Sequence, residues 1–149
     1  MEIKTLDSEG LEFLTQEEGL RLKPYFDSVG IPTIGVGSTY WEDGRRVKMT
    51  DPPITKARAL ELFHNVVKPY EKLVWSTTRD DINQNQFNAL VSLAFNIGQT
   101  GFKKSSVLKK INANFSEEEI RQSWLLWKFA GNKPILLNRR KREFQLYIN

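Results

Sequence analysis

The chain of 149 residues contains no cysteine and a single histidine, His64. Without cysteine there is no disulfide framework and no thiolate nucleophile. One histidine excludes a catalytic or zinc site built on several histidines. The sequence also has no run of about 18 apolar residues that could span a membrane, and it contains no internal repeat or low-complexity segment. These absences exclude disulfide-stabilised, thiol-dependent and membrane-spanning classes of protein.

The remaining composition is that of an ordinary globular protein, with 40% hydrophobic and 27% charged residues. Its net charge of +4 is a weak indication of a polyanionic partner such as nucleic acid, anionic lipid or an acidic cell wall. The N-terminus has no apolar core of signal-peptide length, so we expect synthesis in the cytoplasm and export only with help. The spacing of acidic residues typical of calcium loops is missing, so no metal or other cofactor is expected.

The first half of the chain predicts one helix and a small sheet. Residues 8–18 have helical periodicity, with Ser8 as N-cap and Gly19 as the left-handed stop. From 22 to 48 the helical period is lost, and β-branched and aromatic residues alternate with glycine-rich turns. This pattern predicts two or three short antiparallel strands, which need helices to lean on.

The second half predicts helices only. Residues 55–75 have apolar side chains at spacings of three and four, although Pro69 should kink or break that helix. Residues 83–98 carry a strongly apolar face, Ser116 and Glu119 fit a capping box, and Trp124 and Trp127 share a face. We therefore expect a single α+β domain over 1–149: a sheet lobe at about 15–55, a connecting helix at about 55–75, and a helical lobe at about 76–149 packed with helix 8–18.

Three polar residues stand out in the glycine-rich stretch: Glu18, Asp27 and Thr33. If residues 28–32 connect a hairpin, Asp27 and Thr33 face each other with Cβ atoms about 5 Å apart. A carboxylic acid paired with a carboxylate that activates water is the arrangement of inverting glycosidases, whose carboxyl groups lie roughly 6.5–9.5 Å apart. The same residues also fit helix caps and solvated turns, and spacing alone leaves both interpretations open.

The stretch E-G-L-R-L-K-x-Y-x-D-x-x-G-x-x-T-I-G-x-G, residues 18–37, resembles the active-site segment of the phage-type lysozymes. Residues 86–98, 105–108 and 138–143 are similar to further segments of that family, in the same order. The resemblance implies a lysozyme-like fold that hydrolyses the β-1,4 bond between N-acetylmuramic acid and N-acetylglucosamine in peptidoglycan. It assigns Glu18 as general acid, Asp27 as the group that stabilises charge or acts as base, and Thr33 as a holder of water, with inversion at the anomeric carbon.

The same resemblance implies further residues with less specific roles. Arg139 is expected to reach toward Glu18, and Arg142 toward Glu17. The alternative for Arg139 is a solvated basic helix face. Contacts with the saccharide are expected from Thr39, Phe95, Ser105 and Ser106, although Phe95 also fits a core position and the two serines fit a helix cap. The implied partner is peptidoglycan. We expect the protein to be a monomer that does not insert stably into a membrane, and to reach the wall from the host cytoplasm through a separate membrane pore.

One departure from the family pattern is Ser38, where many members carry histidine. It raises a second hypothesis, a lysozyme-like module that binds peptidoglycan without cleaving it. The basic run at 139–142 raises a third, a nucleic-acid binder, although no helix-turn-helix or aromatic RNA-binding signature accompanies the run. We therefore expect no nucleic-acid partner.

Overall fold

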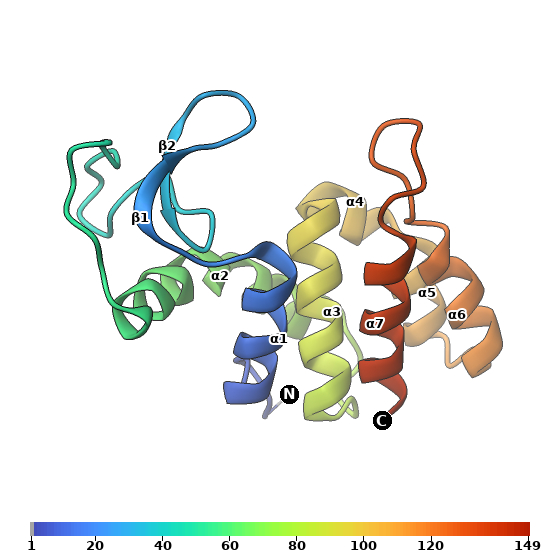
Figure 1. Cartoon of the computed structure of the whole chain (residues 1–149). Coiled ribbons are helices and arrows are strands. Elements are labelled where there is room, and N and C mark those ends of the chain that lie inside the picture. Colours follow the sequence, from blue (N-terminus) through green and yellow to red (C-terminus); the bar gives the residue numbers. More distant parts are fainter. Residues whose placement is uncertain (1) are drawn as a thin grey trace. The chain divides into compact units, whose positions relative to one another are not determined.

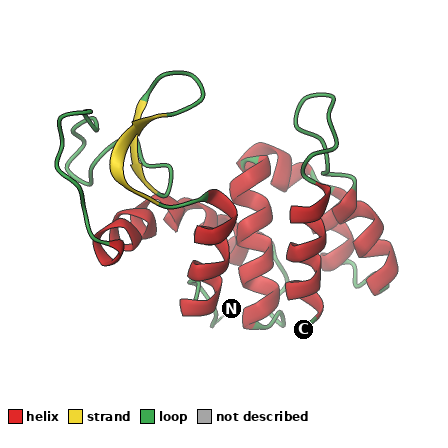
Figure 2. Cartoon of the chain, in the orientation of Figure 1, coloured by secondary structure: helices red, strands yellow, loops and turns green. Residues whose placement is uncertain are grey.

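The computed structural model describes residues 2–149, which form seven helices and one two-stranded antiparallel sheet (Figures 1 and 2). The predicted α+β class is therefore confirmed. In chain order the elements are α1 (Ser8–Glu18), β1 (Arg21–Phe26), β2 (Pro32–Gly35), α2 (Lys56–Thr77), α3 (Gln84–Ile97), α4 (Gln99–Lys104), α5 (Ser106–Asn112), α6 (Glu117–Leu125) and α7 (Leu137–Ile148).

The chain divides into two compact units, which are described separately below. The sheet unit comprises Leu11–Lys68, and the helical unit comprises Met1–Gly10 together with Pro69–Asn149. Helix α2 passes from one unit to the other at Pro69 and is continuous through it. Of the kink or break expected at this proline, the break is absent and the kink stays a prediction. Because proline removes only one donor, the hydrogen bonds of the other turns in this 22-residue helix sustain it.

The N-cap of helix α1 lies one residue earlier in the chain than the sequence predicts. The amide of Gly10 donates to Asp7 Oδ1 at 2.9 Å, so Asp7 is the cap and Ser8 is already helical. A Cβ atom on Gly10 would lie 2.4 Å from the side chain of Asn88, which itself donates to Asp7. The helix ends as predicted, since Gly19 has φ of 87° and donates to Thr15 O at 2.8 Å.

The core of the sheet unit is small. Ile34 of β2, Val47 and Leu62 of α2 form its buried cluster, and Trp41 and Ile54 cover this cluster from the loop that follows the sheet. A two-stranded sheet is marginal on its own, so these few contacts with α2 hold it in place.

The helical unit is built around α3. Every residue from Phe87 to Ala94 is buried, so the helix is enclosed on all sides rather than only on the apolar face that the sequence indicates. It packs most extensively against α7 and also against α4 (Figure 1). A capping box between Asn83 and Gln86 begins the helix, and Gly98 ends it as predicted. Helix α4, which follows at once, is not predicted by the sequence pattern.

Candidate active site

Glu18 is the last residue of α1, and its side chain is exposed. The unpaired carbonyl groups at this end of a helix carry partial negative charge, which does not favour a carboxylate there. Glycine at position 19 then turns the chain directly into β1. The sequence therefore places an acid where helix stability alone does not call for one.

Asp27 lies in the turn of the hairpin rather than in a strand. The register pairs Tyr25 with Thr33 and Phe26 with Pro32, so the predicted pairing of Asp27 directly opposite Thr33 is wrong. The connection begins one residue earlier than expected because Asp27 organises it. Its Oδ1 accepts the amides of Val29 at 2.9 Å and Ile31 at 2.8 Å. Aspartate commonly folds a turn in this way.

Thr33 is diagonal to Asp27 across the hairpin, a relation that separates Cβ atoms by roughly 7 Å. Its Oγ1 donates to the carbonyl of Ile31 at 2.8 Å. Ile31 thus binds both side chains, Asp27 through its N–H and Thr33 through its C=O. Among residues 2–149, Asp27 Oδ2 forms no hydrogen bond, and Thr33 has its proton engaged and can only accept.

The glycine-rich loop after β2 contains Ser38 and Thr39. Ser38 is 2% exposed, and its hydroxyl has no hydrogen-bond partner within the described part of the chain. Its backbone is nevertheless fixed, because Ser38 and Ile34 exchange amide hydrogen bonds of 2.9 and 3.0 Å. Thr39 is half-buried and accepts the amide of Val47 through its carbonyl at 2.9 Å. The loop is therefore held by the backbone and not by the side chain at position 38.

The other predicted saccharide contacts lie in the helical unit. Phe95 is half-buried and meets the ring of Tyr70 edge-on, with centroids 4.9 Å apart. Ser105 is buried and caps α5: its hydroxyl accepts the amide of Leu108 and donates to the carbonyl of Phe102. Ser106 is exposed beside the half-buried Trp127, and the two residues line one shallow depression.

A buried ionic network anchors α7. Arg140 and Glu143 are both fully buried, and Arg140 Nε lies 2.9 Å from Glu143 Oε1. Arg139 donates to the same carboxylate at 3.2 Å, and Ser92 of α3 donates to it at 2.5 Å. Burial raises the pKa of Glu143, whereas Arg140, Ser92 and Arg139 act in the opposite direction.

The basic run of α7 is therefore only partly a solvated face. Arg139 and Arg140 are buried, and only Lys141 and Arg142 of this run are exposed. Guanidinium groups in the protein interior do not reach phosphates, so only two of the four basic side chains of this run are available to a nucleic acid.

The predicted residues thus fall into two groups. The sheet unit contains Glu18, Asp27, Thr33 and Thr39, and the helical unit contains Phe95, Ser105, Ser106 and Arg139. Between residues 2 and 149, no group of three or more acidic, histidine or cysteine side chains is placed to hold a metal ion. None of the helices in that range is both long and apolar enough to cross a membrane.

Sequence reasoning missed two features. The N-x-x-Q spacing of Asn83 and Gln86 is a readable capping signal, and it places the start of α3. The second feature is a small cavity in the helical unit, lined by residues such as Arg79, Gln86 and Tyr147. It is assembled from distant segments and leaves no local signal in the sequence.

Comparison with known proteins gives a consistent result. The family model described as phage lysozyme matches residues 15–143. The endolysin of Salmonella phage P22 is 43% identical over 145 residues, which cover 97% of this chain and 98% of that protein. A crystal structure of a P22 lysozyme mutant matches with a TM-score of 0.91 and 42% identity over 99% of this chain and all of that one. An endolysin from Escherichia coli O157:H7 phage FAHEc1 matches with a TM-score of 0.86 and 32% identity, over 97% and 94% of the two chains.

Proposed function

The chain belongs to the phage lysozyme family and is a peptidoglycan hydrolase that acts on the bacterial cell wall; from this premise, we propose how it cleaves its substrate. The bond is the β-1,4 link between N-acetylmuramic acid and N-acetylglucosamine. Glu18 is the general acid, and Asp27 and Thr33 position the attacking water. The observation that carries this proposal is the attachment of Asp27 and Thr33 to the two backbone groups of Ile31.

Glu18 protonates the glycosidic oxygen as the bond breaks. A neutral carboxyl group has one proton to give, and proton transfer to a leaving group contributes typically 10²–10⁴-fold to a rate. The Glu18 side chain is exposed at the end of α1, beside the turn at Gly19, and is therefore accessible to a bound glycan.

The water is held by two acceptors. Asp27 Oδ2 is unbonded among the described residues, and Thr33 Oγ1 has its proton engaged by Ile31. A water that donates one hydrogen bond to each of these two oxygens directs a lone pair away from both, so the lone pair is available for attack. Asp27 then takes the proton as the water adds to the anomeric carbon. Attack from the face opposite the leaving group inverts the configuration at that carbon.

The remaining contacts position the glycan. We assign saccharide contacts to Thr39, Phe95 and Ser106, whose side chains are partly or fully accessible. Ser105 is a weaker candidate because its hydroxyl is already used in both directions. Arg139 is engaged by Glu143 and Ser92 within the helical unit, and its pairing with Glu18 stays a prediction. A separate membrane pore gives the enzyme its access to the wall.

The test is a digest of purified sacculi analysed by mass spectrometry. Hydrolysis by this mechanism releases muropeptides that end in reducing N-acetylmuramic acid, one water heavier than anhydro products. Wild-type protein is expected to release them, and their stereochemistry is read in the first turnovers by NMR. Binding to sacculi without release of reducing ends would support the non-catalytic module instead, and anhydro ends would exclude attack by water.

A further inference from the structure

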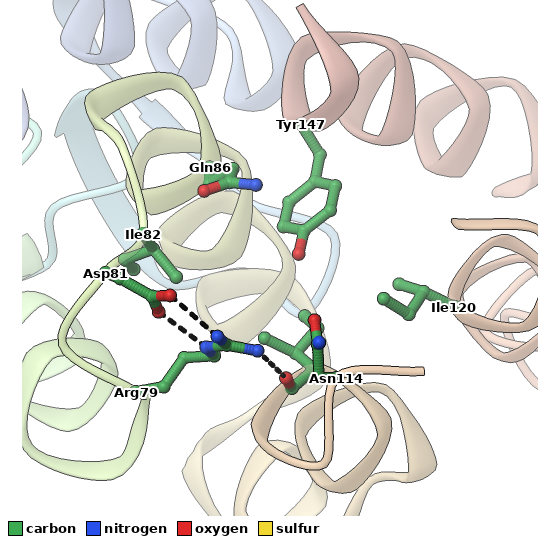
Figure 3. A pocket seen from close by; sticks show the side chains of 8 residues that line it. Arg79, Asp81, Ile82, Gln86, Asn114, Ile120 and Tyr147 are labelled. Atoms are coloured by element: carbon green, nitrogen blue, oxygen red, sulfur yellow. Dashed lines mark hydrogen bonds and ion pairs between the residues drawn. The ribbon is translucent and has the colours of Figure 1, made fainter. Parts of the chain in front are cut away.

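A cavity of about 160 Å³ lies in the helical unit, and none of the residues assigned above lines it (Figure 3). Its walls come from the α2–α3 connection, α3, the end of α5, α6 and α7. The volume equals the share of roughly five water molecules, and it is well below the about 300 Å³ at which pockets for whole small molecules begin. The cavity therefore accepts a substituent of a ligand and not a complete sugar.

Tyr147 supplies an unused polar group to this cavity. The residue is only 7% exposed, and its ring is fixed by Trp124 and Phe144 at centroid distances of 5.2 and 5.9 Å. Its hydroxyl forms no hydrogen bond within residues 2–149, and it points into the space between Gln86, Arg79 and Asn114 (Figure 3). Burial raises the pKa of Tyr147, so the hydroxyl keeps its proton at neutral pH.

Two amides add unused donors beside this hydroxyl. The Oε1 atom of Gln86 accepts the amide of Asn83 at 2.8 Å, which leaves its Nε2 directed toward Tyr147 (Figure 3). The side chain of Asn114 forms no hydrogen bond among the described residues and reaches the cavity from beyond α5. Gln86 is half-buried and Asn114 is exposed, so both side chains are accessible to a ligand that enters the cavity.

The charges in the cavity cancel. Arg79 binds Asp81 through two hydrogen bonds of 2.5 and 2.6 Å, and its third nitrogen donates to the carbonyl of Ile111. An anion would have to displace Asp81, and a cation would have to displace Arg79. The other walls are the apolar side chains of Ile82, Ile111 and Ile120. A neutral group with one carbonyl and one methyl suits this lining.

We propose that this cavity is a secondary glycan site that takes the acetamido group of an N-acetylated amino sugar. The carbonyl accepts from the Tyr147 hydroxyl and Gln86 Nε2, the amide N–H donates to the side chain of Asn114, and the methyl lies against the isoleucines. The inference rests on the proposed function, because the wall polymer presents such groups in series. A second contact on one polymer raises the effective concentration at the first.

The test uses ¹⁵N-labelled wild-type protein titrated with N-acetylglucosamine, which has no glycosidic bond to cleave. The side-chain amide signals of Gln86 and Asn114 are expected to shift and saturate. Glucose and glucosamine, which lack the acetamido group, should leave them in place. N-acetyl-D-alanine amide presents the same chemistry on a peptide; its binding in preference to the sugar would overturn the saccharide assignment, as would an equal response to glucose or no response at all.

Two variants keep the test independent of folding. Tyr147→Phe removes only the hydroxyl and should weaken binding about tenfold, the loss of one good hydrogen bond. Asn114→Gly removes the amide at a residue with φ of 57°, which glycine adopts without strain, and should weaken binding similarly. Tyr40→Phe, in the exposed part of the sheet unit, is the matched control. Unchanged affinity in both cavity variants would contradict the proposal.

Digestion of sacculi by the same preparations separates the two proposals. Release of reducing ends without amide shifts overturns the secondary site and leaves the hydrolase intact. Amide shifts without release of reducing ends support the cavity as a binding site and remove the catalytic mechanism. With both proposals correct, Tyr147→Phe raises KM on sacculi and leaves kcat unchanged.

Discussion

The contacts that stabilise the sheet unit internally differ from those that stabilise the helical unit internally. In the hairpin, Asp27 and Thr33 bind Ile31 at sequence separations of four and two residues. In the helical unit, Ser92 binds Glu143 across 51 residues, and Asn88 binds Asp7 across 81. The proposed chemistry is thus set by short-range turn geometry, and the scaffold by long-range contacts. Substitutions should therefore affect activity in the first unit and stability in the second.

The largest loss of stability is expected in the helical unit from Glu143→Gln. The change leaves Arg139 and Arg140 buried without their carboxylate, and breaking a buried pair costs about 3–5 kcal/mol. Thermal unfolding should show a drop of roughly 10 °C. Glu118→Gln is the control, because that acid is exposed and 3.7 Å from Arg121. Equal shifts for the two variants would mean that the network does not anchor α7.

In the sheet unit, Asp27→Asn should lower kcat roughly 10²–10⁴-fold, the usual contribution of a catalytic acid or base. Asparagine keeps the side-chain oxygen that accepts Val29 and Ile31, so the turn and the unfolding temperature should be preserved. Initial rates on sacculi, measured beside thermal unfolding, check both parts. Wild-type rates in a folded Asp27→Asn variant would remove Asp27 from the mechanism.

Thr33→Val tests the second acceptor with a side chain of similar shape. The substitution removes the hydrogen bond to Ile31 and the proposed contact with water. We expect a rate about tenfold lower, which corresponds to about 1.4 kcal/mol in the activation barrier. Thr33→Ser keeps the hydroxyl and should retain most of the activity. The order of rates, wild type first, then Ser, then Val, is the expected result; equal rates for Ser and Val would contradict it.

The smallest effects come from two serines that are each 2% exposed. Ser38→Ala removes an unpaired hydroxyl and should stabilise the protein by about 1 kcal/mol. Ser105→Ala removes a helix cap and should destabilise it by about 1 kcal/mol. Urea unfolding of both variants gives the sign of each change in the free energy of unfolding. A destabilising Ser38→Ala would mean that this hydroxyl has a partner in solution.

The same contrast explains what the sequence could predict. Helix α1 through Glu18 and the stop at Gly19 depend on local chemistry and spacing, and both are confirmed. The roles of Glu18, Asp27 and Thr33 come from the resemblance and stay a prediction. The observed hairpin register differs from the predicted one because Asp27 folds the turn through its side chain. The alternation of hydrophobic residues does not indicate that hydrogen bond.

The long-range features could not be predicted in this way. Arginine is rarely fully buried, so Arg140 is assigned to a solvated face unless its contact with Glu143 is known. The cavity beneath Tyr147 depends on segments that meet only in the folded chain. Such features follow from tertiary packing, which a single sequence does not specify residue by residue.

The most direct test of the central claim compares Glu18→Gln with Glu17→Gln on purified sacculi. The two acids are neighbours at the end of α1, and each substitution removes one ionisable group with little change in shape. The account predicts that Glu18→Gln loses about 10²–10⁴-fold in kcat at an unchanged unfolding temperature, while Glu17→Gln stays within a few-fold of wild type. Undiminished release of reducing ends by Glu18→Gln would contradict it.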